Sequence, residues 1–146
     1  MSKSEIVKDI VNGRVDFYIE ALVKYFDAPP DDMHVVVCRE QLTAKWTEEY
    51  EKWELSELIF YQEQAKCDWN QSYEKEFPKL AAQHLPDSEA KMDQLFDTCQ
   101  AQAAAFYATE VGQKKIALDK ACKRWTQAAV QLLSRAFPRE DNKDTA

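Results

Sequence analysis

The chain has 146 residues and a mass of 17.0 kDa, and 45% of its residues are hydrophobic, which fits one globular domain. Its 19 basic and 26 acidic residues give a formal net charge of −7, so we expect nucleic acid and anionic membrane surfaces to repel it. Only 2 glycines are present, which argues against phosphate-binding loops and tight hairpin turns.

The first predicted helix runs from about Ser2 to Phe26. Ser2 and Glu5 have the spacing of a capping box, and apolar residues follow at intervals of three or four. These apolar positions are Val7, Val11, Val15, Tyr18, Leu22 and Tyr25. The prolines of the segment 27–32 should end the helix, and Asp32 can cap the next one.

The segment 33–77 is also predicted to be helical. Its apolar positions at helical spacing are Cys38, Leu42, Trp46, Tyr50 and Trp53, followed by Leu58, Tyr61, Ala65, Trp69, Tyr73 and Phe77. Either one long rod or two helices would satisfy this pattern. We favour a break between residues 47 and 56, because globular helices seldom exceed about 20 residues.

The last third of the chain predicts further helices. Pro78 suits the first turn of a short helix over 79–84, and Ser88 can cap a helix that carries Met92, Leu95, Phe96, Cys99, Ala103 and Phe106. Thr109 should cap the last helix, which Pro138 ends. Its apolar stripe is Ala117, Ala121, Trp125, Ala128, Leu132 and Phe137. We expect this stripe to pack against the middle of the chain.

Together these elements predict an all-α fold without a sheet. It should be a single-domain bundle of about five or six helices, built from helical hairpins, over residues 1–138. Residues 139–146 are charged and nearly free of apolar side chains, and we expect a disordered tail there.

The charge is distributed unevenly along the chain. Residues 40–76 contain ten acids and four bases, a net charge of −6, whereas residues 110–135 contain six bases and two acids, a net charge of +4. Either these are two solvated faces that attract one another across the bundle, or the acidic region forms a face for a basic partner.

The dipeptide Phe-Tyr occurs three times, at 17–18, 60–61 and 106–107, each time followed by a nearby glutamate. The spacing between the copies is in the range of two-helix repeats. Two interpretations stay open, an internal duplication and the chance placement of core aromatic residues.

One motif carries a family resemblance. The segment 106–115, Phe-Tyr-Ala-Thr-Glu-Val-Gly-Gln-Lys-Lys, resembles the signature of the DUF2059 family of helical bacterial proteins, and residues 46–61 look like a divergent copy of the same family's pattern. The chain differs from the family in having Glu110 where proline is usual and Lys66 where the upstream copy would have glycine. The resemblance implies a helical fold and an envelope location, and it implies no activity.

The sequence offers little for catalysis or metal binding. Its four cysteines, Cys38, Cys67, Cys99 and Cys122, form no CxxC pair and are best interpreted as small buried apolar residues. His34 and His84 have no second imidazole at metal-binding spacing. We therefore expect neither metal nor cofactor, and no enzyme activity.

The N-terminus lacks the apolar core of a signal peptide, and no apolar run is long enough to span a bilayer. We expect a cytoplasmic protein without membrane insertion, or a periplasmic one if a signal has been removed. The oligomeric state stays open.

Trp46, Tyr50 and Trp53 suggest a function. They share one helical side and are surrounded by acidic residues, which is a pattern of interface anchors inside a charged rim. We expect a non-enzymatic interaction module that binds a protein or peptide, one with basic character, through this face. The alternatives are core packing of the three rings, an immunity or antitoxin-like protein that neutralises a bacterial toxin, and a helical carrier of an apolar small molecule.

Overall fold

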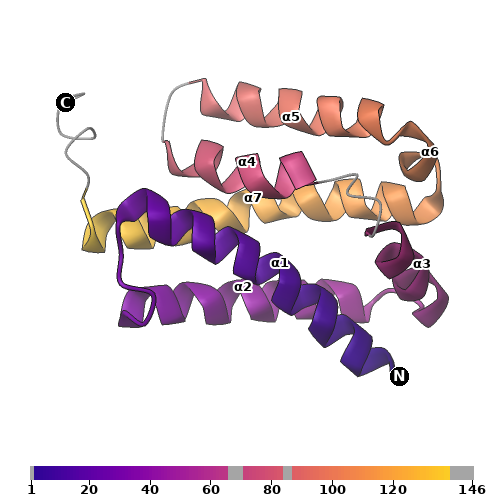
Figure 1. Cartoon of the computed structure of the whole chain (residues 1–146), viewed down its shortest axis with the longest axis horizontal. Coiled ribbons are helices and arrows are strands. Elements are labelled where there is room, and N and C mark those ends of the chain that lie inside the picture. The colour runs from indigo at the N-terminus through magenta and orange to yellow at the C-terminus, as the bar shows by residue number, and fades with distance from the viewer. Residues whose placement is uncertain (1, 66–70, 84–86, 139–146) are drawn as a thin grey trace.

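A computed structural model describes residues 2–65, 71–83 and 87–138, and these residues form seven helices and no strand (Figure 1). The helices are α1 (Lys3–Phe26), α2 (Met33–Glu51), α3 (Leu55–Ala65), α4 (Gln71–Ala82), α5 (Ser88–Gln102), α6 (Ala104–Tyr107) and α7 (Glu110–Ala136). The predicted all-α class is confirmed. The expected tail, Cys67, Trp69 and His84 lie outside the described residues.

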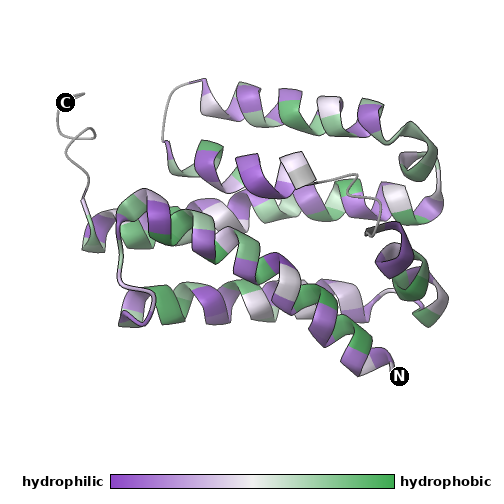
Figure 2. Cartoon of the chain, viewed as in Figure 1, coloured by the Kyte–Doolittle hydropathy of each residue, from purple (hydrophilic) through white to green (hydrophobic). Residues whose placement is uncertain are grey.

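The long helix α7 organises the bundle. In Figure 1 it lies between α4 and α5 on one side and α2 on the other, while α1 crosses in front. Helix α1 packs against α2 and α4, and α7 packs against the same two helices. Every long helix carries both apolar and polar positions (Figure 2), as expected for a bundle with one core and a solvated exterior.

Three predicted helix caps are confirmed. The Ser2 hydroxyl accepts a hydrogen bond from the Glu5 N–H at 3.3 Å, and an Asp32 carboxylate oxygen accepts one from the His34 N–H at 2.8 Å. The Thr109 hydroxyl accepts one from the Gly112 N–H at 3.0 Å. Each side chain satisfies one of the backbone donors that a helix N-terminus leaves unpaired.

The predicted break in the middle segment is also confirmed. Helix α2 ends at Glu51 and α3 begins at Leu55, so the break lies between residues 47 and 56. The Glu57 carboxylate accepts a hydrogen bond from the Glu54 N–H at 2.8 Å, which caps the start of α3.

The position of Pro78 differs from the prediction. It was expected to begin a short helix, but it lies inside α4, with a buried ring. Proline removes one helical hydrogen bond, here the one that would reach Glu74. The same helix buries Tyr73 and Phe77 completely, and that burial outweighs the lost hydrogen bond.

Two smaller boundaries also differ from the prediction. Asp87, not Ser88, is the N-cap of α5, and its side chain makes no capping hydrogen bond. The helix expected to reach Phe106 is interrupted at Ala103, whose φ of −120° and ψ of 42° separate α5 from the short α6.

The face of α7 that is buried in the core differs most from the prediction. The expected stripe faces outward at Ala117 and Ala128, which are exposed, and is only half-buried at Ala121 and Trp125. The buried face of α7 instead consists of Val111, Gly112, Lys115, Leu118, Asp119, Cys122, Thr126, Ala129, Val130 and Leu133. The helix is therefore rotated away from the orientation that its apolar stripe predicts, and three polar side chains enter the core.

Gly112 allows the close junction between α6 and α7. A Cβ atom at this position would lie 2.3 Å from the Phe106 carbonyl oxygen and 2.6 Å from the Tyr107 Cα, both of which are backbone atoms. Backbone atoms cannot rotate away as a side chain can. Glycine is therefore required here by the close approach of the two helices.

We predict that Gly112→Ala lowers the free energy of unfolding by about 1–3 kcal/mol, because overpacking outweighs the better helix propensity of alanine. Gly13→Ala is the matched control, since a Cβ there meets nothing within 4 Å. It should stabilise the protein by roughly 0.5–1 kcal/mol. Urea unfolding of both variants checks this pair, and effects of the same sign would contradict it.

Candidate functional site

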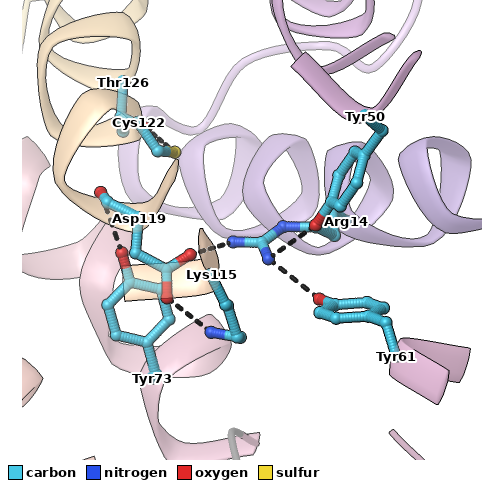
Figure 3. Close-up of polar contacts among 8 residues, drawn as sticks. All are labelled: Arg14, Tyr50, Tyr61, Tyr73, Lys115, Asp119, Cys122 and Thr126. Carbon is cyan, nitrogen blue, oxygen red and sulfur yellow. Dashed lines mark hydrogen bonds and ion pairs between the residues drawn. The ribbon is translucent and has the colours of Figure 1, made fainter. Parts of the chain in front are cut away.

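A buried ionic cluster lies at the centre of the bundle (Figure 3). Arg14 of α1 places one guanidinium nitrogen 2.7 Å from a carboxylate oxygen of Asp119 on α7. Its other terminal nitrogen donates to the hydroxyl oxygens of Tyr50, at 3.1 Å, and Tyr61, at 3.0 Å. One side chain thus joins α1 to α2, α3 and α7.

Lys115 is the second cation of the cluster. It lies one turn before Asp119 on α7 and binds the other oxygen of that carboxylate. Its amine also lies 4.9 Å from the ring centre of Tyr73 and 5.8 Å from that of Tyr107, within the range of cation–π interactions. Tyr73 donates its hydroxyl to the Asp119 carbonyl oxygen at 3.3 Å, which connects α4 to the same point.

The environment shifts the pKa values of these groups. Desolvation lowers the pKa of Lys115 below the ordinary 10.5, although the neighbouring Asp119 carboxylate opposes this shift. Burial alone would also lower the pKa of Arg14, but Tyr50, Tyr61 and Asp119 raise it overall. Burial raises the pKa of Tyr18, Tyr50 and Tyr73 well above 10.0, so these phenols stay protonated.

The three predicted site residues surround this cluster and are not on the surface. The exposed fractions of Trp46, Tyr50 and Trp53 are 0%, 0% and 5%. Arg14 lies 5.1 Å from the centre of the Trp46 ring, and Trp53 packs edge-on against Tyr50 at 4.9 Å. This burial favours the alternative interpretation, core packing of the three rings, although Trp53 also lines a hollow beside α7.

The cluster is enclosed and its charges are committed to one another. Arg14, Lys115 and Asp119 are each at most 3% exposed. Two nearby donor groups, the Arg14 Nε and the Trp46 indole nitrogen, have no hydrogen-bond partner among the described residues. Unpaired buried donors are costly, at about 1–3 kcal/mol each. The ion pairs and hydrogen bonds of the cluster link the helices, and its enclosed charges offer no accessible acid or base.

Sequence reasoning missed Arg14, Lys115 and Asp119, although a signal was present. Arg14 lies three residues after Val11 and four before Tyr18, so it shares their side of α1. Lys115 and Asp119 are likewise spaced by four and could have been assigned to one face. The available signal of a buried charge was a charged residue on the apolar face of a helix. This signal is weak in a helix that has many aliphatic residues.

A groove with a largely apolar floor lies between α2 and α7. Two adjoining hollows of about 320 and 430 Å³ share Lys45, Arg124 and Trp125, and we call them together the α2/α7 groove. The apolar residues that line the groove are Leu42, Ala44, Trp53, Ala117, Leu118, Ala121, Trp125, Ala128 and Ala129. Most of the expected apolar stripe of α7 therefore lines this open groove.

The charged residues of the groove are mainly basic. Lys45, Lys52, Lys114 and Arg124 line it together with Glu48 and Glu49, so four cations and two acids give a net charge of +2. Lys52 pairs with Glu49 at 3.2 Å, and Lys114 pairs with Glu57 of α3 at 2.6 Å. The latter pair is the attraction between acidic and basic regions that the sequence predicted, but Lys123 pairs instead with Glu89 and Asp93 of α5.

Several other features bear on function. Over the described ranges, no group of three His, Cys, Asp or Glu side chains could hold a metal ion. Within those same ranges, no helix has the length and apolar character needed to cross a bilayer. The described cysteines, Cys38, Cys99 and Cys122, are free and buried.

Comparison with known proteins gives no match: no family model, curated protein or solved structure matches the chain. The resemblance to the DUF2059 family stays a prediction.

We predict that Asp119→Asn destabilises the fold by about 3–5 kcal/mol, because it leaves Arg14 and Lys115 buried without a counter-charge. Asp16→Asn is the matched control. Asp16 also pairs with an arginine, Arg39, but that pair is 44% and 60% exposed. Its loss should cost less than about 1 kcal/mol. Equal losses in urea unfolding would contradict a special role for the buried pair.

We also predict that stability falls as the pH rises above about 9–10. Burial raises the pKa of Cys38 to about 11 and of Cys122 to about 12, and it raises the pKa of the buried tyrosines. These groups deprotonate at a lower pH in the unfolded chain than in the folded protein. Their contribution to the free energy of unfolding is therefore complete at a pH below their ordinary pKa values, and it is lost as the pH rises above those values.

The effect of Lys115 on the pH dependence of stability has the opposite sign, because its pKa is lowered in the folded protein. It is one group against several. Urea unfolding between about pH 8 and pH 11, with phenolate absorbance as a second readout, checks the expectation. Tyr73→Phe should make the decline shallower. A free energy of unfolding that stays constant over this range would contradict the prediction.

Proposed function

We propose that this protein is a non-enzymatic helical interaction module that binds a protein partner in the α2/α7 groove. The observation that carries the proposal is the orientation of α7. Its stripe of alanines and Trp125 lines an open groove, while charged residues of the same helix occupy the core. A continuous apolar surface that remains outside the core is typical of a recognition surface.

Other exposed apolar residues are less suited to this role. The large ones, Phe17, Met33, Val36, Leu55 and Ile59, are between 42% and 70% exposed and are distributed over three helices. Single exposed apolar side chains are common on monomeric proteins. The groove differs because two neighbouring helices contribute to one hollow.

The non-enzymatic part of the proposal is supported by the state of the ionisable groups. The Asp119 carboxylate is held on one oxygen by Arg14 and on the other by Lys115. General acid–base catalysis requires a group within reach of substrate. The most strongly perturbed groups in the described structure lie instead inside a closed core.

The groove also changes what is expected of the partner. The sequence favoured a basic partner, recognised by an acidic face with aromatic anchors. Trp46 and Tyr50 are fully buried, Trp53 is 5% exposed at the edge of the groove, and the groove has basic side chains along it. A cytoplasmic location stays a prediction, and toxin neutralisation and small-molecule transport are alternative outcomes of the test.

The test compares variants that fill the groove with polar side chains. Ala117→Gln combined with Ala128→Gln should abolish binding of the partner in a pull-down, because both alanines are exposed on the groove floor. The helix should remain folded, because glutamine is a good helix former. Ala90→Gln, at an exposed position of α5, is the control.

A partner that binds the wild type and the control but is lost with the double variant would support the proposal. Equal capture by all three proteins would contradict it. Native mass spectrometry of the purified protein separates the carrier alternative, which predicts a bound small molecule that the double variant loses.

A further inference from the structure

We infer that the partner of the α2/α7 groove is an acidic amphipathic helix of about three turns, whose carboxylates pair with Lys45 and Arg124. This inference rests on the proposed function, since it specifies what the groove binds. It follows from the length of the groove, the size of the side chains on its floor and the distribution of charge along its two walls.

The groove has the length of a short helix. Helices α2 and α7 run in opposite directions along it, because the hollow that contains Gln41 also contains Ala128, and the one that contains Lys52 also contains Lys114. The eleven residue steps from Gln41 to Lys52 correspond to about 17 Å of helix. A partner helix of about 12 residues would cover this distance.

The floor of the groove favours a helix over an extended peptide. Alanines at Ala44, Ala117, Ala121 and Ala128 keep the floor low, so the backbone of a third helix could approach closely and pack its side-chain ridges between α2 and α7. An extended peptide would leave its backbone N–H and C=O groups facing apolar side chains. A helix satisfies these groups internally.

The charge along the groove favours an acidic helix. Lys45 on α2 and Arg124 on α7 line both hollows, and neither makes an ion pair with another described residue. The other two groove cations, Lys52 and Lys114, already have carboxylate partners. With the pairs Lys52–Glu49 and Lys114–Glu57 set aside, Lys45, Arg124 and Glu48 give the groove a net charge of +1, against −7 for the whole chain, so the groove is a local basic surface on an acidic protein.

Nucleic acid would also be attracted to these two cations. The overall charge of −7 opposes it, because a polyanion is repelled by an acidic protein. We therefore favour a protein helix, and the experiment keeps the other ligand as an outcome.

The experiment identifies the partner segment directly. A photo-activatable benzophenone amino acid at Ala121, on the groove floor, is cross-linked in the cells that produce the protein, and the cross-linked peptide is sequenced. The same group at exposed Lys8 of α1 is the control. We expect a peptide specific to Ala121 that has an apolar stripe at helical spacing flanked by Asp or Glu.

A basic or uncharged peptide, a second copy of this chain, or cross-linked nucleic acid would overturn the inference. The identified segment is then synthesised, and its affinity is measured with Lys45→Glu/Arg124→Glu. We expect a loss of at least tenfold, together with a weaker salt dependence. The control, Lys8→Glu/Lys24→Glu, changes the net charge equally at exposed positions of α1 and should bind as the wild type does.

The two proposals fail in different ways. If Ala117→Gln/Ala128→Gln loses the partner but the charge reversal at Lys45 and Arg124 does not, the groove binds a partner and the acidic character is wrong. If neither double variant loses it, both proposals are wrong.

Discussion

The ion pair between Arg14 and Asp119 is the interaction on which the rest of the structure depends. It crosses from α1 to α7 at 2.7 Å inside the core, and the same guanidinium reaches the hydroxyls of Tyr50 and Tyr61. A buried charge is tolerated only with a partner and further hydrogen bonds, and here those of one side chain link four helices. Lys115 and Tyr73 extend the requirement to α4.

This cluster determines which face of α7 is left outside. Lys115 and Asp119 must point inward to meet Arg14 and the tyrosines, and the helix geometry then directs Ala117, Ala121 and Ala128 toward the exterior. The bundle therefore gives up the burial of an apolar stripe. Trp125 connects the two regions, since it lines the groove and packs at 5.9 Å against Trp46, which in turn lies beside Arg14.

The fold was predictable from the sequence where local signals act. Capping residues such as Ser2, Asp32 and Thr109 and the spacing of apolar residues in α1 and α2 gave correct helix starts and faces. Pro78 was misinterpreted because a local rule was applied where tertiary burial of Tyr73 and Phe77 decides.

The candidate site was not predictable in the same way. Apolar periodicity placed the wrong face of α7 in the core, because it cannot anticipate that Arg14, more than a hundred residues away, provides a counter-charge for Asp119. Trp46 and Tyr50 were correctly grouped on one side of α2, whereas Trp53 lies beyond the end of that helix, in the break before α3. Whether such a group is an anchor or a core depends on what covers it, and here the cover comes from distant segments.

The most direct test of this account is the accessibility of the alanine methyl groups of α7. Methyl-labelled alanine can be observed by NMR in the presence of a soluble paramagnetic agent, without any partner. The account predicts strong relaxation enhancement for Ala117 and Ala128, which are exposed, and little for Ala129, which is 2% exposed, or for Ala82 of α4, which is fully buried. Protection of Ala117 and Ala128 to the same degree as Ala129 would show that the stripe faces the core and would contradict the account.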